Sequence, residues 1–165
     1  MNKNLVSAAL LVLTLSTPAL AGGAGAPVTG ANAQVVAATP AALMAALKEA
    51  GYRVTMDPAS PDSDPSMTVM AGEYEVSVWL SNCSAGKCSR VTASTYWDYS
   101  DSEDDLDTEL TNDWNSNYYT QSYVYEGAYY LDSTMPIAGG YTKATLKAWM
   151  TDYLNDVQDF EMELP

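Results

Sequence analysis

The stretch Glu73–Asp98, EYEVSVWLSNCSAGKCSRVTASTYWD, contains the pattern that decides the fold. Every second residue from Tyr74 to Leu80 is apolar, which is typical of a strand with one buried face. The segment 89–98 repeats the alternation, with one face formed by Val91, Ala93 and Trp97. Two such runs joined by a short loop predict an antiparallel hairpin.

Cys83 and Cys88 are the only cysteines and lie in the loop of this hairpin. Disulfides persist in oxidising compartments, and the N-terminal sequence indicates export, so we expect the pair to be bonded. A loop this short adds only about 2 kcal/mol in the loop-entropy model, so the bridge would mainly fix the hairpin register. A redox switch is the alternative, but the C-x4-C spacing differs from the C-x-x-C of thiol oxidoreductases. We therefore interpret the disulfide as structural.

Residues 1–21 have the composition of a secretory signal peptide. Lys3 supplies the positive start, residues 5–15 form a short apolar run, and the sequence before Gly22 ends in an A-x-A cleavage site at Ala21. The run is too short for a comfortable membrane span. We expect cleavage near Ala21, a periplasmic or secreted protein without a membrane span, a flexible leader over 22–38 and one folded domain over 39–165.

The chain is strongly acidic, with 7 basic against 21 acidic residues and a net charge of −14. This charge repels nucleic-acid phosphates and anionic lipid headgroups, so we expect neither as a partner. Histidine is absent from the sequence, which excludes Ser-His and Cys-His nucleophile pairs and histidine-based zinc sites. We expect no cofactor and no catalytic residues. Paired carboxylates keep one alternative open, a carboxylate-dependent hydrolase of the cell envelope.

Acidic residues are concentrated between Asp98 and Asp113. Oxygen ligands suit calcium, but an EF-hand loop that began at Asp101 would have Leu106 where glycine is required. We expect instead a helix capped by Ser102, whose first-turn carboxylates interact favourably with the helix dipole. We therefore predict no metal site, although weak calcium binding by this stretch stays an open alternative.

The remaining elements follow from caps and alternation. Thr39 and Pro40 predict the start of a helix that ends at Gly51, and Thr142 caps a final helix to about Met162. Strands are expected over 66–71, 73–81, 89–98, 118–126 and 128–133. The short run 52–56 also alternates like a strand but is not counted. We predict an α+β fold with a five-stranded antiparallel sheet, helices on one face and the order α-β-β-β-α-β-β-α.

Aromatic residues are the main candidates for a binding surface. The chain has 12 tyrosines and four tryptophans against one phenylalanine. If helices cover one sheet face, several of these side chains would lie on the other, and we assign the candidate binding face to Trp79, Tyr96, Tyr119, Tyr123 and Tyr125. The competing interpretation is that tyrosine simply favours strands.

Several motifs occur in a familiar order. Leu47 precedes Gly51-Tyr52, Cys83 and Cys88 flank a hairpin tip, Asn112-Asp113-Trp114-Asn115 precedes the second hairpin, and Gly139-Gly140 precedes the last helix. In these features the chain resembles the YbjN family, described as bacterial sensory transduction regulators, over roughly residues 43–164. The family's Asn-x-Trp-Asn segment corresponds to Asn112, Trp114 and Asn115. We expect these residues and the two glycines to be structural.

The resemblance also implies a function. The YbjN fold is similar to that of type III secretion chaperones, which bind extended polypeptide and often dimerise, so peptide capture or a homodimer is implied. The family has no established catalytic residues. We therefore expect an exported, non-catalytic binding or regulatory domain that contacts a protein segment or envelope component. A structural or stress-related envelope protein without a specific ligand is another alternative, beside the hydrolase.

Overall fold

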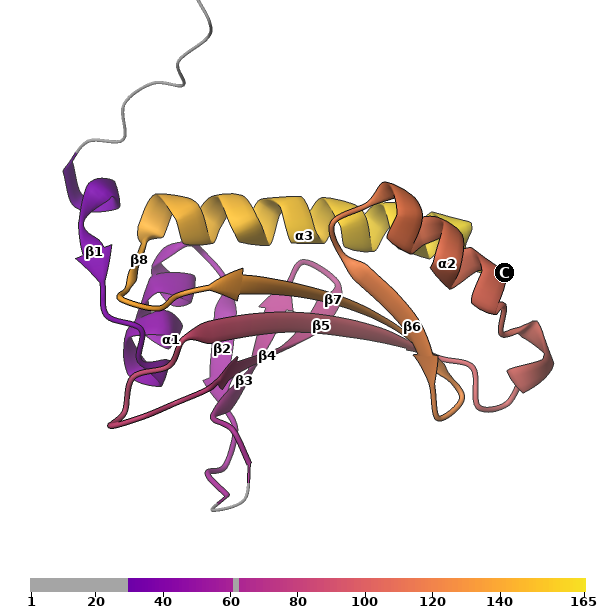
Figure 1. The fold of residues 1–165 in the computed structure, drawn as a ribbon, viewed down its shortest axis with the longest axis horizontal. Helices are drawn as coiled ribbons and strands as arrows, with labels where there is room; N and C mark the ends of the chain where they lie inside the picture. The colour runs from indigo at the N-terminus through magenta and orange to yellow at the C-terminus, as the bar shows by residue number, and fades with distance from the viewer. Residues whose placement is uncertain (1–29, 61–62) are drawn as a thin grey trace, which may run out of the picture.

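The structure is a computed structural model that describes residues 30–60 and 63–165. The expected signal peptide and the first part of the leader lie outside these residues. Along the chain (Figure 1) the elements are η1 Gly30–Ala33, β1 Val35–Val36, α1 Pro40–Glu49, β2 Arg53–Met56, β3 Ser66–Ala71, β4 Tyr74–Ser81, β5 Arg90–Asp98, η2 Glu103–Asp105, α2 Thr108–Asn117, β6 Gln121–Tyr125, β7 Ala128–Pro136, β8 Tyr141–Thr142 and α3 Lys143–Glu163.

The main sheet is antiparallel throughout and has six strands in the order β2-β3-β4-β5-β7-β6. The α+β class and the antiparallel pairing are confirmed, but the prediction of five strands in the order α-β-β-β-α-β-β-α is wrong. The run at 52–56 forms the sixth strand, β2, which pairs with β3 from Arg53↔Met70 to Met56↔Met67. The sequence pattern that would predict β2 is weak because only Val54 is buried in this short edge strand.

The three helices pack on one face of the main sheet. Val76, Val78 and Leu80 of β4 are fully buried beneath them, as the alternation predicted. Figure 1 shows α3 running along the sheet, and its buried residues are Leu146, Met150, Tyr153, Val157 and Phe160. α2 joins the same layer through Trp114, whose ring lies 4.9 Å from that of Phe160. The opposite face is left without a helix among the described residues.

Two of the predicted helix starts are confirmed by their caps. The Thr39 hydroxyl accepts a hydrogen bond from the Ala42 amide, with Pro40 in the first helical position of α1. Gly51, with φ +104°, follows the end of this helix. The Thr142 hydroxyl accepts from the Thr145 amide at 3.0 Å, which caps α3. These caps satisfy amide groups that the first turn of a helix leaves unpaired.

The start of α2 differs from the prediction. Ser102 makes no capping hydrogen bond, and residues 103–105 form a separate 3-10 turn. α2 begins at Thr108, where Asp107 accepts from the Glu109 amide at 2.7 Å. The Tyr129 hydroxyl causes the break, because it donates to the Asp105 carbonyl at 3.2 Å and accepts from the Asp107 amide. A tertiary contact thus interrupts a helix that local signals would have continued.

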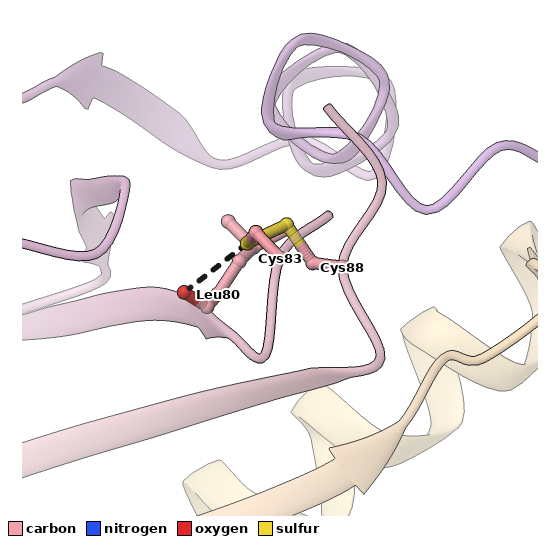
Figure 2. Close-up of a disulfide and its surroundings, with 3 residues drawn as sticks. All are labelled: Leu80, Cys83 and Cys88. Atoms are coloured by element: carbon pink, nitrogen blue, oxygen red, sulfur yellow. Dashed lines mark hydrogen bonds between the residues drawn. A yellow bond between two sulfur atoms is a disulfide. The ribbon is translucent and has the colours of Figure 1, made fainter. Parts of the chain in front are cut away.

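The hairpin between β4 and β5 closes through the expected disulfide. Cys83 and Cys88 are bonded to each other (Figure 2), and the Sγ atom of Cys83 lies 3.8 Å from the Leu80 oxygen, a contact only, since a bonded sulfur carries no hydrogen. Between them, Ala85 and Gly86 both have positive φ, at +50° and +74°. This is the conformation of a type I′ turn, which suits the twist of antiparallel strands.

Residues 30–38, expected to be part of a flexible leader, are anchored to the domain. β1 pairs with β8 through Val35↔Thr142 and Val36↔Tyr141 in a small second sheet. The Ala38 carbonyl accepts from the Cys88 amide at 2.8 Å. Gly140 permits this approach, because a Cβ there would lie 2.5 Å from Val35 Cγ1 and 2.7 Å from the Val36 oxygen.

Candidate functional site

The uncovered face of the sheet carries four neighbouring tyrosines. Cross-strand pairing places Tyr96 of β5 and Tyr123 of β6 on either side of Tyr130 in β7. The ring centroid of Tyr130 lies 5.8 Å from that of Tyr96, 5.2 Å from that of Tyr123 and 6.3 Å from that of Tyr125. We call these four residues the tyrosine cluster.

The tyrosine cluster is accessible to a partner. Tyr96 is 59% exposed, Tyr125 56% and Tyr123 38%, whereas Tyr130 at the centre is half-buried. The rings of Tyr123 and Tyr130 are almost parallel, with an interplanar angle of 5°. The cluster therefore offers apolar ring surface together with hydroxyl groups, a combination enriched in binding surfaces.

The other two candidate residues lie elsewhere. Trp79 is on the same sheet face but half-buried, and it pairs with Thr92 of β5, four residues before Tyr96. At about 3.3 Å per residue this is roughly 13 Å from the cluster along the strand. Tyr119 precedes β6, lies outside the paired strand and has a fully exposed side chain. The structure thus brings together three of the five predicted residues.

Tyr130 is the member of the cluster that sequence reasoning missed. It follows Tyr129 directly, and adjacent strand residues point to opposite faces. Tyr129 is fully buried on the helix side, so Tyr130 must lie on the open face. The adjacent tyrosines could have indicated from the sequence that one of the two lies on the open face. Only the pairing of β7 with both β5 and β6 shows that Tyr130 is the centre of the cluster.

Asp132 borders the cluster and was also missed. Its Oδ2 atom accepts a hydrogen bond from the Tyr123 hydroxyl at 3.2 Å, while its Oδ1 atom is buried without a partner among the described residues. Burial raises the pKa of the Asp132 carboxyl, and the nearby hydroxyls of Ser94 and Tyr123 partly oppose this rise. Burial, with the nearby Asp132 charge, raises the pKa of Tyr123 to about 12. The phenol therefore stays protonated and acts as a donor at neutral pH.

Two of the family-motif residues, Trp114 and Asn115, connect α2 to the segment 120–122. Trp114 is buried, and its Nε1 donates to the Thr120 hydroxyl at 2.9 Å. The Asn115 side chain donates to the Ser122 carbonyl at 2.9 Å and accepts from the Ser122 amide at 2.8 Å, which ties α2 to β6. Asn112 is exposed. Gly139, with φ +83°, adjoins Gly140 in the turn before β8.

An acidic groove lies between α2 and the end of α3. Its volume is about 790 Å³, and its lining includes Asp107, Glu109, Asp113 and Glu163. All four carboxylates are exposed. Over residues 30–60 and 63–165, no three acidic or cysteine side chains converge closely enough to hold a metal ion. The groove therefore lacks the buried carboxylate that an acid–base hydrolase requires.

Among the described helices, none has the length and apolar composition needed to cross a bilayer. The curated proteins contain no match to this sequence. Among solved structures, the chain is similar to an uncharacterized protein from Methanothermobacter thermautotrophicus, at 12% sequence identity and a TM-score of 0.49, over 73% of this chain and 92% of that chain.

A family model matches residues 39–164, and its description is "YbjN: Putative bacterial sensory transduction regulator". The matched segment contains the complete six-stranded sheet and all three α-helices. The description names a regulator and no catalytic activity. Because the match spans most of the sequence, this chain belongs to the YbjN family.

Proposed function

We propose that this protein is an exported, non-catalytic binding or regulatory domain, and that the tyrosine cluster contacts a protein segment or an envelope component. The observation that carries the proposal is the cluster itself, with three exposed tyrosines around Tyr130 on a sheet face that no described helix covers. Membership of a family described as regulators supports a binding role.

The physical properties of the cluster suit recognition. Tyrosine buries a large apolar area on binding and still has a hydroxyl that can pair with polar groups of the partner. Such residues dominate the binding energy of many interfaces. Asp132 lies beside the rings and adds a hydrogen-bond acceptor at the border of the cluster.

A periplasmic or secreted location is part of the proposal. The N-terminal sequence supports export, and the bonded pair Cys83–Cys88 agrees with an oxidising compartment. In that setting the charge of −14 favours partners with basic segments over anionic polymers.

The test is site-specific photo-crosslinking in living cells. A photoreactive residue replaces Tyr96 or Tyr123 in the cluster, and Gln158 on the exposed side of α3 serves as the matched control. We expect a discrete adduct from the two cluster positions and none from position 158. The same adducts from all three positions, or none from the cluster, would contradict the proposal. A further probe at Trp79 measures whether the contact extends across the sheet face.

A further inference from the structure

The outer edge of β7 is unpaired along its last residues, as far as the described chain shows. β5 pairs with β7 over its whole length, from Ala128 to Pro136. β6 pairs only with the first part, from Ala128 to Asp132. Figure 1 shows the remainder of β7 continuing beneath α3 without a strand on its outer side.

Backbone groups at this edge point outward. The Ile137 amide donates to the Ser89 carbonyl and the Tyr99 amide donates to the Gly127 carbonyl, each at 2.8 Å, so odd-numbered residues of this segment face β5. In an antiparallel sheet the direction alternates along the strand. The amide and carbonyl of Thr134 and the carbonyl of Pro136 therefore face away from β5. Unpaired groups of this kind are a template for another strand.

β6 begins at Gln121, so it does not reach the last residues of β7. The register Gln121↔Asp132, extended by two residues, would place Tyr119 opposite Thr134. Thr120 lies outside the strand, and its buried hydroxyl accepts from Trp114 Nε1 and donates to Asp156 Oδ2, both at 2.9 Å. Tyr119 and Thr120 line a cavity together with Thr134, and β6 does not pair with Thr134.

A groove adjoins the open position. Its cavity volume is about 520 Å³, and it lies between the edge of β7 and α3. Trp149 forms part of the wall and is held there by the bond from its Nε1 to the Ser133 hydroxyl at 2.9 Å. Asp152 and Asp156, one turn apart on α3, also line the groove. Burial is the main cause that raises the pKa of Asp156, and the neighbouring charges of Asp159 and Asp152 add to it.

Charge decides which occupant suits the groove. A second copy paired through the same edge would bring its own Asp152 and Asp156 toward the first pair, between chains that each carry −14. Like charges in such an arrangement oppose association. An extended segment with lysine or arginine side chains would instead pair with both carboxylates while its backbone bonds to Thr134.

We propose that β7 accepts an extended, basic segment of a partner protein as an additional strand beside Thr134–Pro136, in line with β6, with the cationic side chains over Asp152 and Asp156. This mode of recognition joins backbone hydrogen bonds with side-chain selection. It goes beyond the proposed function because it uses the sheet edge and the helix side, not the open face with the tyrosine cluster.

The first test uses the peptide acetyl-Lys-Val-Lys-Val-Lys-amide. Residues opposite each other in a sheet share a face, so valine opposite Thr134 directs its amide to β7 while lysine faces α3. We expect N-methylation of the valines to weaken binding at least about fivefold, since one hydrogen bond contributes about 1 kcal/mol. N-methylation of the lysines should have little effect. Equal affinities of the two methylated peptides, or no binding at millimolar peptide, would overturn the proposal.

The second test changes the protein. Asp152→Asn with Asp156→Asn should weaken binding about fivefold, in line with two ion pairs at the protein surface, and should reduce its salt dependence. Asp159→Asn is the matched control, because Asp159 is exposed on α3 outside the groove. Hydrogen exchange of the Thr134 amide should slow when the peptide is bound. Unchanged exchange together with unchanged affinity in the double variant would refute the site.

Tyr123→Ala separates this inference from the proposed function. This substitution alters the tyrosine cluster but not the β7 groove. We expect it to leave the affinity for the peptide unchanged. If it abolishes peptide binding while the melting temperature is retained, the peptide binds the open face and the edge site is wrong.

Discussion

At the scale of single residues, Asp132 is the side chain least expected from the sequence. It sits on a sheet face that is open as a whole, yet one of its carboxyl oxygens is buried and lacks a partner in the described chain. Burying an unpaired polar atom costs free energy of folding. The Tyr123 hydroxyl offsets part of this cost through its bond to the other oxygen.

Asp132→Asn should make the stability of the protein at neutral pH higher than that of the wild type. Because burial raises the pKa of Asp132 above its ordinary 3.8, the folded state binds the proton more tightly than the unfolded state. The contribution of Asp132 to the stability of the protein is therefore fully present at low pH and is lost as the pH rises through the raised pKa. Asparagine keeps an acceptor for Tyr123 and carries no charge.

Urea unfolding of both proteins from pH 3 to pH 7 measures this effect. The advantage of the asparagine variant should grow with pH over the interval between the ordinary and raised pKa values of Asp132. A difference that is constant over the whole pH range would show that the charge of Asp132 is not the cause.

At the scale of elements, the caps explain why two helices begin where local signals place them and one does not. Thr39 and Thr142 make the capping bonds that their sequences predict. At α2 the Tyr129 hydroxyl separates the turn 103–105 from the helix and makes Asp107 the cap. Element boundaries therefore depend on packing as well as on capping chemistry.

Asp107→Ala should destabilise the protein by about 1 kcal/mol, the usual cost of losing a side-chain N-cap. Ser102→Ala, at the position the sequence favoured as a cap, should change stability by only a few tenths, since Ser102 makes no capping bond. Chemical denaturation of the two variants compares them directly. A larger loss of stability in the Ser102 variant than in the Asp107 variant would contradict this and would support the longer helix expected from the sequence.

At the scale of the whole molecule, the negative charge is spread over exposed side chains. The acidic groove between α2 and α3 contains four carboxylates, but over residues 30–60 and 63–165 acidic side chains do not converge into a metal-binding group. Calcium requires six to eight oxygen ligands at short distance. The described acidic side chains are spread out and do not form such a ligand set.

Calcium should leave the melting temperature unchanged. Because a ligand that binds only the native state stabilises it by mass action, a specific calcium site would raise the melting temperature increasingly as the calcium concentration exceeds the dissociation constant. Thermal unfolding with millimolar calcium, with magnesium as the control for ionic strength, measures the effect. An increase of several degrees with calcium alone would show that the acidic stretch does form a site.

Features that depend on neighbouring residues could be predicted from the sequence. Alternation over 74–80 predicted a strand with one buried face, the caps at Thr39 and Thr142 predicted two helix starts, and the spacing of Cys83 and Cys88 predicted a bonded hairpin tip. These signals are local, since each arises from side chains a few residues apart that act on the same backbone segment.

Features that depend on distant residues are seen only in the folded chain. Tyr130 is the centre of the tyrosine cluster because β7 lies between β5 and β6. The Tyr129 hydroxyl, more than 20 residues away in sequence, bonds to the backbone between the 3-10 turn 103–105 and α2. The short strand β2 joins the sheet through its pairing with β3. Within the described chain, Thr134 is left unpaired on its outer side because β6 begins only at Gln121. Such contacts join segments whose separation the sequence pattern does not encode, so only the folded chain brings them together.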